Sequence, residues 1–229
     1  MSRGLGDVYK RQFESCASGG GRFDPGILYY APQGWTSDDT DAAERVKIQY
    51  GTSMCYPVSS MGSHVSVVPN HQLNRKTPLH TRANVAYFGT FGYELDLNKL
   101  SDEEISEVKQ QITFMKEYRE LIQFGTFYRL KSPFEGNETV WMTVSEDKKT
   151  ALVFWYRERN VVNADFTRVR LQGLDPDFIY RNEYNETENY GDELMNLGLL
   201  TTDCTAGEPT SEDEPCTDYE SRIYVLTAK

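Results

Sequence analysis

The sequence predicts an α/β region that forms part of a (β/α)8 (TIM) barrel, followed by an antiparallel β-sandwich. Strand-like and helix-like segments alternate up to about residue 125, and short strand patterns separated by turns follow. We therefore expect three parts: residues 1–12 as a leader foreign to the fold, residues 13–125 as the barrel part and residues 126–229 as the sandwich domain.

The alternation begins directly after the expected leader. The segment FESC (13–16) has the pattern of a strand and runs into the glycine-rich turn ASGGGR, DPGILYY (24–30) favours a short helix, and QGWTS (33–37) favours an extended segment. Asp41 and Glu44 have capping-box spacing, so a helix is predicted from Asp41 to about Gly51. In a βα-barrel the loops after the strands meet at one mouth, where we expect Asp38 and the loop after Cys16 to lie.

The rest of the α/β region contains one strong helix signal. Residues 59–78 are interpreted as loop-rich, and residues 79–97 as an apolar helix that carries glycines. Residues 101–123 have a capping box at their start and Gly125 after their end. The apolar face expected to pack on the core comprises Ile105, Val108, Ile112, Met115 and Ile122.

Strand patterns dominate after residue 126. TVWMTVS (139–145) alternates apolar and polar residues, and TALVFWYR (150–157) is predicted to pair with it as a hairpin around the turn SEDKK. Further strands are predicted in TRVRLQG (167–173), DFIYRNEY (177–184) and SRIYVLT (221–227). Repeated short strands with turns between them are typical of an antiparallel sandwich.

Composition narrows the possible partners. A net charge of −11 argues against nucleic acid and against docking on anionic membranes, and no apolar run approaches the roughly 18 residues that a spanning helix needs. The aromatic content of 13% fits a sugar-binding protein, although aromatic residues serve the core first. Residues 1–12 have no apolar core of a secretory signal, so a cytoplasmic location is expected.

Cysteine and histidine spacing gives no metal motif. Neither residue type is arranged so that several side chains would converge on one ion, and no cofactor is expected. The residues concerned are Cys16, Cys55, Cys204, Cys216, His64, His71 and His80. Cys204 and Cys216 flank an acidic stretch and would pair in an oxidising compartment, whereas free thiols are expected in the cytoplasm.

Three aspartates in GWTSDDTDAAERVKIQYG (34–51) raise a question of chemistry. Asp41 is explained as a helix cap, while Asp38 and Asp39 lie outside the helix, where any acidic side chain gains from the helix dipole. Two carboxylates across a sugar ring hydrolyse a glycosidic bond, but residue type alone does not select a pair among 35 acidic residues. The loop CASGGGR (16–22) lacks both phosphate-binding glycine motifs, which leaves a loop for a neutral ligand such as a sugar, or a plain turn.

Taken together, the segments resemble the α-galactosidases of glycoside hydrolase family 36. The resemblance covers nearly all of the chain after residue 12, and the combination of motifs is highly specific. The motifs are FESCASGGGRFDPGILYYAPQGWTSDDTDAAERVKIQYGTS, YPVSSMGSHVS, PNHQ, NVAYFGTFGYELDL, FYRLKSPFEGNETVWM and GDELMNLGL. The resemblance implies the last strands and helices of the catalytic barrel, followed by the C-terminal β-sandwich.

The resemblance also implies roles for particular residues. The acid/base of this family lies in the pattern W-[TS]-S-D-[DN]-T-D, which assigns Asp38 and leaves Asp39 as polar support. The family loop ESCSGGGGRFD contacts galactose through its Cys and a following Gly, here Cys16 and Gly19, although Ala17-Ser18 replaces the usual Ser-Gly. Trp35 is expected to form one side of the sugar-binding pocket, or else to pack within the barrel.

The resemblance leaves half of an active site unaccounted for. The nucleophilic Asp of the family lies in a K-W-D strand before ESC, and the sequence contains no K-W-D triplet. We therefore expect a truncated α-galactosidase that is inactive alone, whose parent takes α-galactoside oligosaccharides such as melibiose and raffinose and assembles as a homo-oligomer, a tetramer. A related α-N-acetylgalactosaminidase or galactosyl transferase, and a non-catalytic carbohydrate-binding or assembly module, are alternatives.

Overall fold

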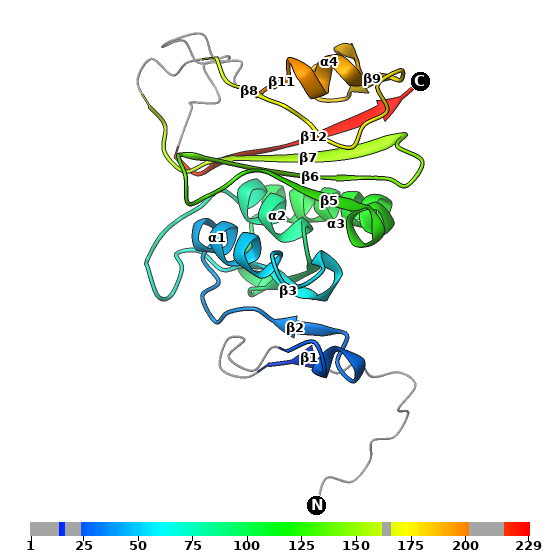
Figure 1. Ribbon diagram of the computed structural model, residues 1–229. Coiled ribbons are helices and arrows are strands. Elements are labelled where there is room, and N and C mark those ends of the chain that lie inside the picture. The colour runs from blue at the N-terminus through cyan, green and yellow to red at the C-terminus, as the bar shows by residue number, and fades with distance from the viewer. Residues whose placement is uncertain (1–13, 17–23, 162–165, 202–217) are drawn as a thin grey trace, which may run out of the picture.

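The computed structural model describes residues 14–16, 24–161, 166–201 and 218–229. Its elements are stacked in layers (Figure 1). A parallel sheet lies at the N-terminal end, helices α1, α2 and α3 form the middle layer, and a six-stranded antiparallel sheet covers the helices. Among the described residues, no helix combines the length and the apolar character that crossing a membrane would require.

The parallel sheet has the order β1-β2-β3-β4, and every neighbouring pair in it is parallel. Its strands are β1 (Glu14–Ser15), β2 (Gln33–Trp35), β3 (Met61–Ser66) and β4 (Thr90–Glu94). The connecting helices are η2 (Ile27–Tyr29), α1 (Ala42–Thr52), η3 (Val58–Ser60), α2 (Leu79–Tyr87), η4 (Leu97–Lys99) and α3 (Asp102–Phe124). Successive parallel strands joined through helices are the repeating unit of a (β/α)8 barrel, so this part of the predicted fold is confirmed.

Both predicted helix starts are confirmed. The Asp41 carboxylate accepts hydrogen bonds from the backbone N–H groups of Ala43 (3.0 Å) and Glu44 (3.2 Å), which begins α1. Ser101 and Glu104 form the complete capping box of α3, which ends at Phe124 before the C-cap Gly125.

Two interpretations in the α/β region were wrong. Residues 61–66 form strand β3 rather than loop, because their buried polar side chains find partners: Ser63 donates to Gln49 Oε1 (2.7 Å) and Ser66 donates to the Thr40 carbonyl (2.6 Å). Residues 79–97 form a helix and then strand β4 rather than one helix. A Cβ at Gly89 would lie 2.6 Å from the Ser63 Cβ, so this glycine permits the close approach of the chain to β3.

The antiparallel sheet has the order β10-β9-β12-β7-β6-β5. Its strands are β5 (Thr126–Lys131), β6 (Glu138–Val144), β7 (Thr150–Arg157), β9 (Ile179–Asn182), β10 (Glu188–Tyr190) and β12 (Glu220–Ala228). The predicted hairpin is confirmed, since β6 and β7 pair from Glu138↔Arg157 to Val144↔Ala151. A second, two-stranded sheet of β8 (Arg168–Val169) and β11 (Leu199–Leu200), with helix α4 (Gly191–Asn196), lies beyond it.

Each face of the six-stranded sheet packs on its own core. Trp141 and Phe154 stack at 4.4 Å between ring centroids and face the cluster built from the helices. Val140 and Val153, one residue along on the same strands, face the cluster that includes Val169 of β8. A sheet covered on both faces confirms the sandwich class and explains why β6 is buried beyond the alternation that its sequence indicates.

Candidate active site

Three of the predicted site residues, Cys16, Trp35 and Asp38, lie on or directly after the first two strands of the parallel sheet. Ser15 pairs with Gly34, so Cys16 and the residues after Trp35 continue from neighbouring strands at their carboxyl ends. Cys16 and Asp38 are both exposed there. Gly19 lies outside the described residues, as do Cys204 and Cys216, so the meeting of the glycine loop with Asp38 stays a prediction.

Asp38 is exposed, and the side chain of Trp35 orients its carboxylate. The Trp35 indole Nε1–H donates to Asp38 Oδ1 at 3.1 Å. Within residues 14–16, 24–161, 166–201 and 218–229, no other hydrogen bond to this carboxylate is found. A carboxylate that is oriented by one donor and still open to solvent can exchange a proton with a bound molecule.

The neighbouring aspartates are committed to backbone and arginine contacts. Asp39 Oδ1 accepts from the backbone N–H of Asp41 at 3.0 Å. Asp41 is 2% exposed and pairs with Arg75 in addition to capping α1. Asp41 is therefore occupied, whereas Asp39 accepts one hydrogen bond, as Asp38 does, and differs from the exposed Asp38 in being half-buried with a backbone donor.

Trp35 is the centre of the cluster around Asp38. Its ring lies 4.8 Å from the His64 ring and 4.5 Å from the Arg45 guanidinium carbon. A Cβ at Gly62 would lie 3.1 Å from Trp35 Cε3 and 2.9 Å from Glu14 Oε1, so glycine is needed where the indole crosses β3. Trp35 therefore packs within the sheet face and also binds Asp38.

Burial and charge shift two pKa values in this cluster. Burial lowers the pKa of His64, although Glu94, with Oε2 4.0 Å from Nδ1, and Glu14 oppose the shift. Burial also lowers the pKa of Arg45 to about 10, against the opposing charges of Glu94, Asp39 and Asp38. His64 is therefore neutral at pH 7, whereas Arg45 keeps its charge.

The described residues contain no group of three or more His, Cys, Asp or Glu side chains able to hold a metal ion. Cys16 and Cys55 are exposed free thiols.

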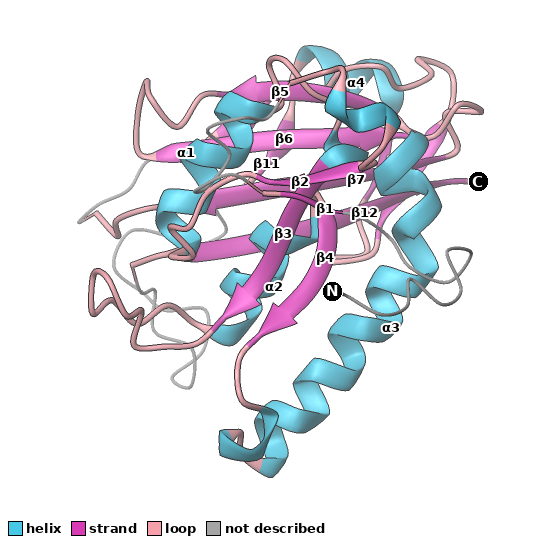
Figure 2. Cartoon of the chain, turned by 90° about the horizontal axis from the view of Figure 1, so that it is seen from below, coloured by secondary structure: helices cyan, strands magenta, loops and turns pink. Residues whose placement is uncertain are grey.

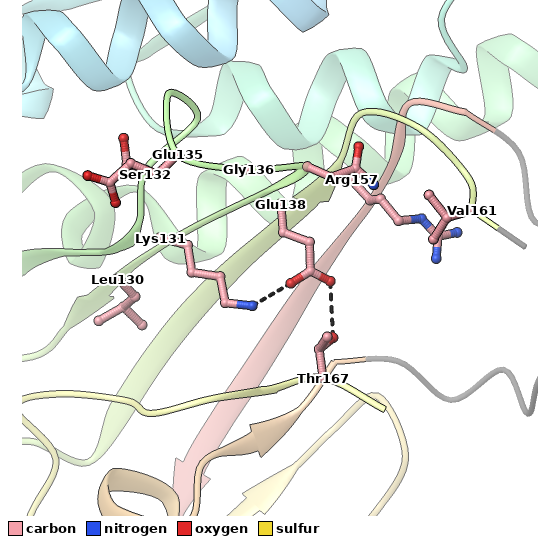
Figure 3. A pocket seen from close by; sticks show the side chains of 10 residues that line it. Leu130, Lys131, Ser132, Glu135, Gly136, Glu138, Arg157, Val161 and Thr167 are labelled. Carbon is pink, nitrogen blue, oxygen red and sulfur yellow. Dashed lines mark hydrogen bonds and ion pairs between the residues drawn. The ribbon is translucent and has the colours of Figure 1, made fainter. Parts of the chain in front are cut away.

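A second carboxylate, that of Glu138, lines a pocket on the antiparallel sheet. This cavity of about 500 Å³ includes Lys131, Glu138, Arg157 and Thr167 in its lining. Figure 3 shows the Glu138 carboxylate between Lys131 and Thr167. It accepts from Lys131 Nζ, from the Thr167 hydroxyl (3.0 Å) and from Trp155 Nε1 (3.2 Å), so it acts as a structural acceptor.

The fold and the site define the class of protein: the carboxyl-terminal end of a (β/α)8 barrel with an attached β-sandwich domain. The Melibiase family matches residues 5–125, and the glycosyl hydrolase family 36 C-terminal domain matches residues 138–226. The chain therefore belongs to the melibiases of glycoside hydrolase family 36.

Curated relatives are similar over most of this chain. Alpha-galactosidase AgaA of Geobacillus stearothermophilus is 57% identical over 82% of this chain, and alpha-galactosidase Mel36A of Lactobacillus acidophilus is 52% identical over 82%. The chain spans only 26% and 25% of the lengths of these relatives.

Solved structures agree with the sequence comparisons. The crystal structure of AgaA superposes with a TM-score of 0.87 at 51% identity and covers 95% of this chain, which matches 29% of that structure. Substituted forms of the same enzyme have been solved in complex with raffinose and with stachyose.

Sequence reasoning missed three members of the cluster around Trp35. Arg45 lies in a helix, where a charged residue ordinarily indicates solvent, yet it is 2% exposed. His64 and Glu94 lie on segments interpreted as loop and helix, so their place on β3 and β4 was not foreseen. The sequence carries no clear signal for the burial of Arg45, because Gln49, one helical turn further along the same face, is itself a buried polar residue.

Proposed function

We propose that this chain supplies the acid/base part of the active site of a retaining α-galactosidase. The observation that supports it best is the exposed Asp38 carboxylate, oriented by Trp35 at the carboxyl edge of the parallel sheet. In βα-barrel enzymes this edge carries the chemistry. The names of the relatives, and their complexes with raffinose and stachyose, favour terminal α-galactosides as substrates.

The proposed mechanism uses Asp38 twice. As an acid it protonates the oxygen of the leaving sugar while a nucleophilic carboxylate attacks the anomeric carbon. As a base it then takes a proton from water, which attacks the galactosyl-enzyme from the face that the leaving group vacated. Two inversions restore the starting α configuration.

The remaining assignments are parts of the same proposal. Cys16 and Gly19 contact galactose from the loop after β1, and Trp35 borders the sugar site. Residues 13–125 act as the barrel part and residues 126–229 as the sandwich domain. The complete enzyme is cytoplasmic and homo-oligomeric, and no cofactor enters the mechanism.

The nucleophile is proposed to come from a K-W-D strand that the 229 residues do not contain. The chain alone is therefore expected to release no p-nitrophenol from p-nitrophenyl α-galactoside. Joining residues 13–229 to the preceding part of AgaA should give an active enzyme, which below is called the complete enzyme. Turnover by the chain alone that Asp38→Ala abolishes would contradict the proposed division of the active site.

A further inference from the structure

The turn that carries Asp38 is held from helix α1 by one buried arginine. Arg45 Nη1 donates to the Thr36 hydroxyl, and Nη2 donates to the Ser37 carbonyl at 3.0 Å. The same guanidinium lies over the Trp35 ring at 4.5 Å. Arg45 thus contacts each of the three consecutive residues, 35 to 37, that directly precede Asp38.

This placement is unfavourable unless the turn keeps its conformation. Arg45 is 2% exposed, and its buried Nε has no hydrogen-bond partner among the described residues. An arginine on the solvent-exposed face of a helix normally extends its guanidinium into water, which Arg45 does not do. The compensating charges are those of Asp38, Asp39 and Glu94, two of which lie on the turn itself.

Trp35 transmits this restraint to the carboxylate. Its ring contacts Arg45 and His64, and its Nε1–H donates to Asp38 Oδ1 at 3.1 Å. A ring fixed by two neighbours has a fixed N–H direction, so the rotamer of Asp38 is selected by the packing of Trp35.

We propose that Arg45 and Trp35 are positioning residues: Arg45 fixes the 35–37 turn, and the Trp35 indole then fixes the Asp38 carboxylate. This inference rests on the acid/base role proposed for Asp38. Arginine suits the task because its planar group stacks on a ring and donates in a fork at the same time, which a lysine ammonium does not do.

The indole signals in a ¹H–¹⁵N spectrum of the 229-residue chain provide the test. The three tryptophans give three such signals, and we expect the Trp35 signal to move with pH in a step that Asp38→Asn removes. Other titrating groups face this cluster, namely Asp39, Glu14, Glu94 and His64. A pH-dependent change of the Trp35 signal that these groups cause persists in the Asp38→Asn variant, so it is distinguished from the change that depends on Asp38.

Arg45→Gln should shift the Trp35 signal and abolish its Asp38-dependent step, while the Trp141 and Trp155 signals keep their positions. Arg45→Lys keeps the charge but loses the paired hydrogen bonds of the guanidinium, so the Asp38-dependent change of the Trp35 signal with pH should become smaller. Arg129→Gln is the matched control, because Arg129 binds the Ser53 side chain and carbonyl at the other end of α1. It should leave the step intact.

Two results would overturn the proposal. One is an unchanged Trp35 step in a folded Arg45→Gln or Arg45→Lys chain. The other is loss of all three indole signals in both variants, which would assign Arg45 to the stability of the whole fold. The spectra involve no turnover, so they separate this inference from the proposed function: Asp38→Asn that leaves the complete enzyme active would refute the latter alone.

Discussion

Asp38 and Glu138 are two carboxylates that differ in the number of donors around them. Asp38 is exposed and has one donor, the Trp35 indole, among the described residues. The Glu138 side chain is 12% exposed and has three donors, including another tryptophan indole, that of Trp155. Asp38 follows β2 of the parallel sheet and Glu138 lies on β6 of the antiparallel sheet, and the helices separate the two sheets (Figure 1). Figure 2 views these layers from below, with β3 and β4 in front of the antiparallel sheet.

The difference shows how the same chemical group serves two purposes. A largely buried carboxylate that accepts from three protein donors stabilises the fold and is poorly placed to exchange a proton with a substrate. One that is oriented by a single donor keeps a free oxygen for chemistry. We therefore expect substitutions at Asp38 to change activity, and those at Glu138 to change stability.

The largest expected effect is on turnover. Asp38→Asn should lower kcat of the complete enzyme on melibiose by roughly 10²–10⁴-fold, since an amide cannot deliver a proton. Asp39→Asn should cost far less, because the amide oxygen still accepts from the Asp41 backbone N–H as the carboxylate does. Steady-state kinetics of the two variants measure this difference in kcat. Equal losses of kcat would contradict the assignment of Asp38 as the acid/base.

The second effect concerns the free energy of unfolding. Glu138→Ala should lower it by about 1–3 kcal/mol, because the Trp155 N–H and the Lys131 ammonium are left without their acceptor. Urea denaturation of the chain measures this, with exposed Glu146→Ala as the control. If Glu138→Ala instead abolished turnover of a folded complete enzyme, the contrast between the two carboxylates would fail.

A smaller effect separates Asp41 from Asp38 within one turn of chain. Asp41→Ala should lower the free energy of unfolding by about 0.5–2 kcal/mol through loss of the N-cap, and it also removes the partner of Arg75. Asp38→Ala should change it by less than about 0.5 kcal/mol. Thermal or urea unfolding in which Asp38→Ala is the more damaging change would contradict the assignment.

The smallest effect is a pH dependence from His64. Burial lowers its pKa in the folded state, so the unfolded chain binds the proton more readily. The stability that His64 contributes is complete above its unfolded pKa of about 6.5 and is lost as pH falls towards the folded pKa. His64→Gln should flatten stability in that range, whereas exposed His71→Gln should not.

Local signals predicted the elements that depend on local physics. The Asp41 cap, the Ser101–Glu104 capping box and the β6–β7 hairpin are each set by residues close in sequence, and all are confirmed. Strands β3 and β4 were missed because their stability comes from distant partners. Ser63 reaches Gln49 of α1, and Gly89 fits against β3, neither of which the segment itself shows.

The residues of the candidate site also differ in how far the sequence predicts their roles. A motif resemblance assigned Asp38, and the structure shows that it is the one exposed member of three nearby aspartates. Arg45 could not be assigned, since its role depends on a turn folded back over α1 and on a ring ten residues before it. Helix position alone predicted solvent for it.

Azide rescue of Asp38→Asn in the complete enzyme tests the acid/base assignment most directly. With p-nitrophenyl α-galactoside, whose leaving group needs little protonation, the galactosyl-enzyme should form and then stall because water lacks a base. Azide needs no deprotonation and attacks the vacated face, so turnover should return with α-galactosyl azide as the product. No rescue, or β-galactosyl azide, which forms when azide replaces a missing nucleophile, would contradict the role of Asp38 as acid/base.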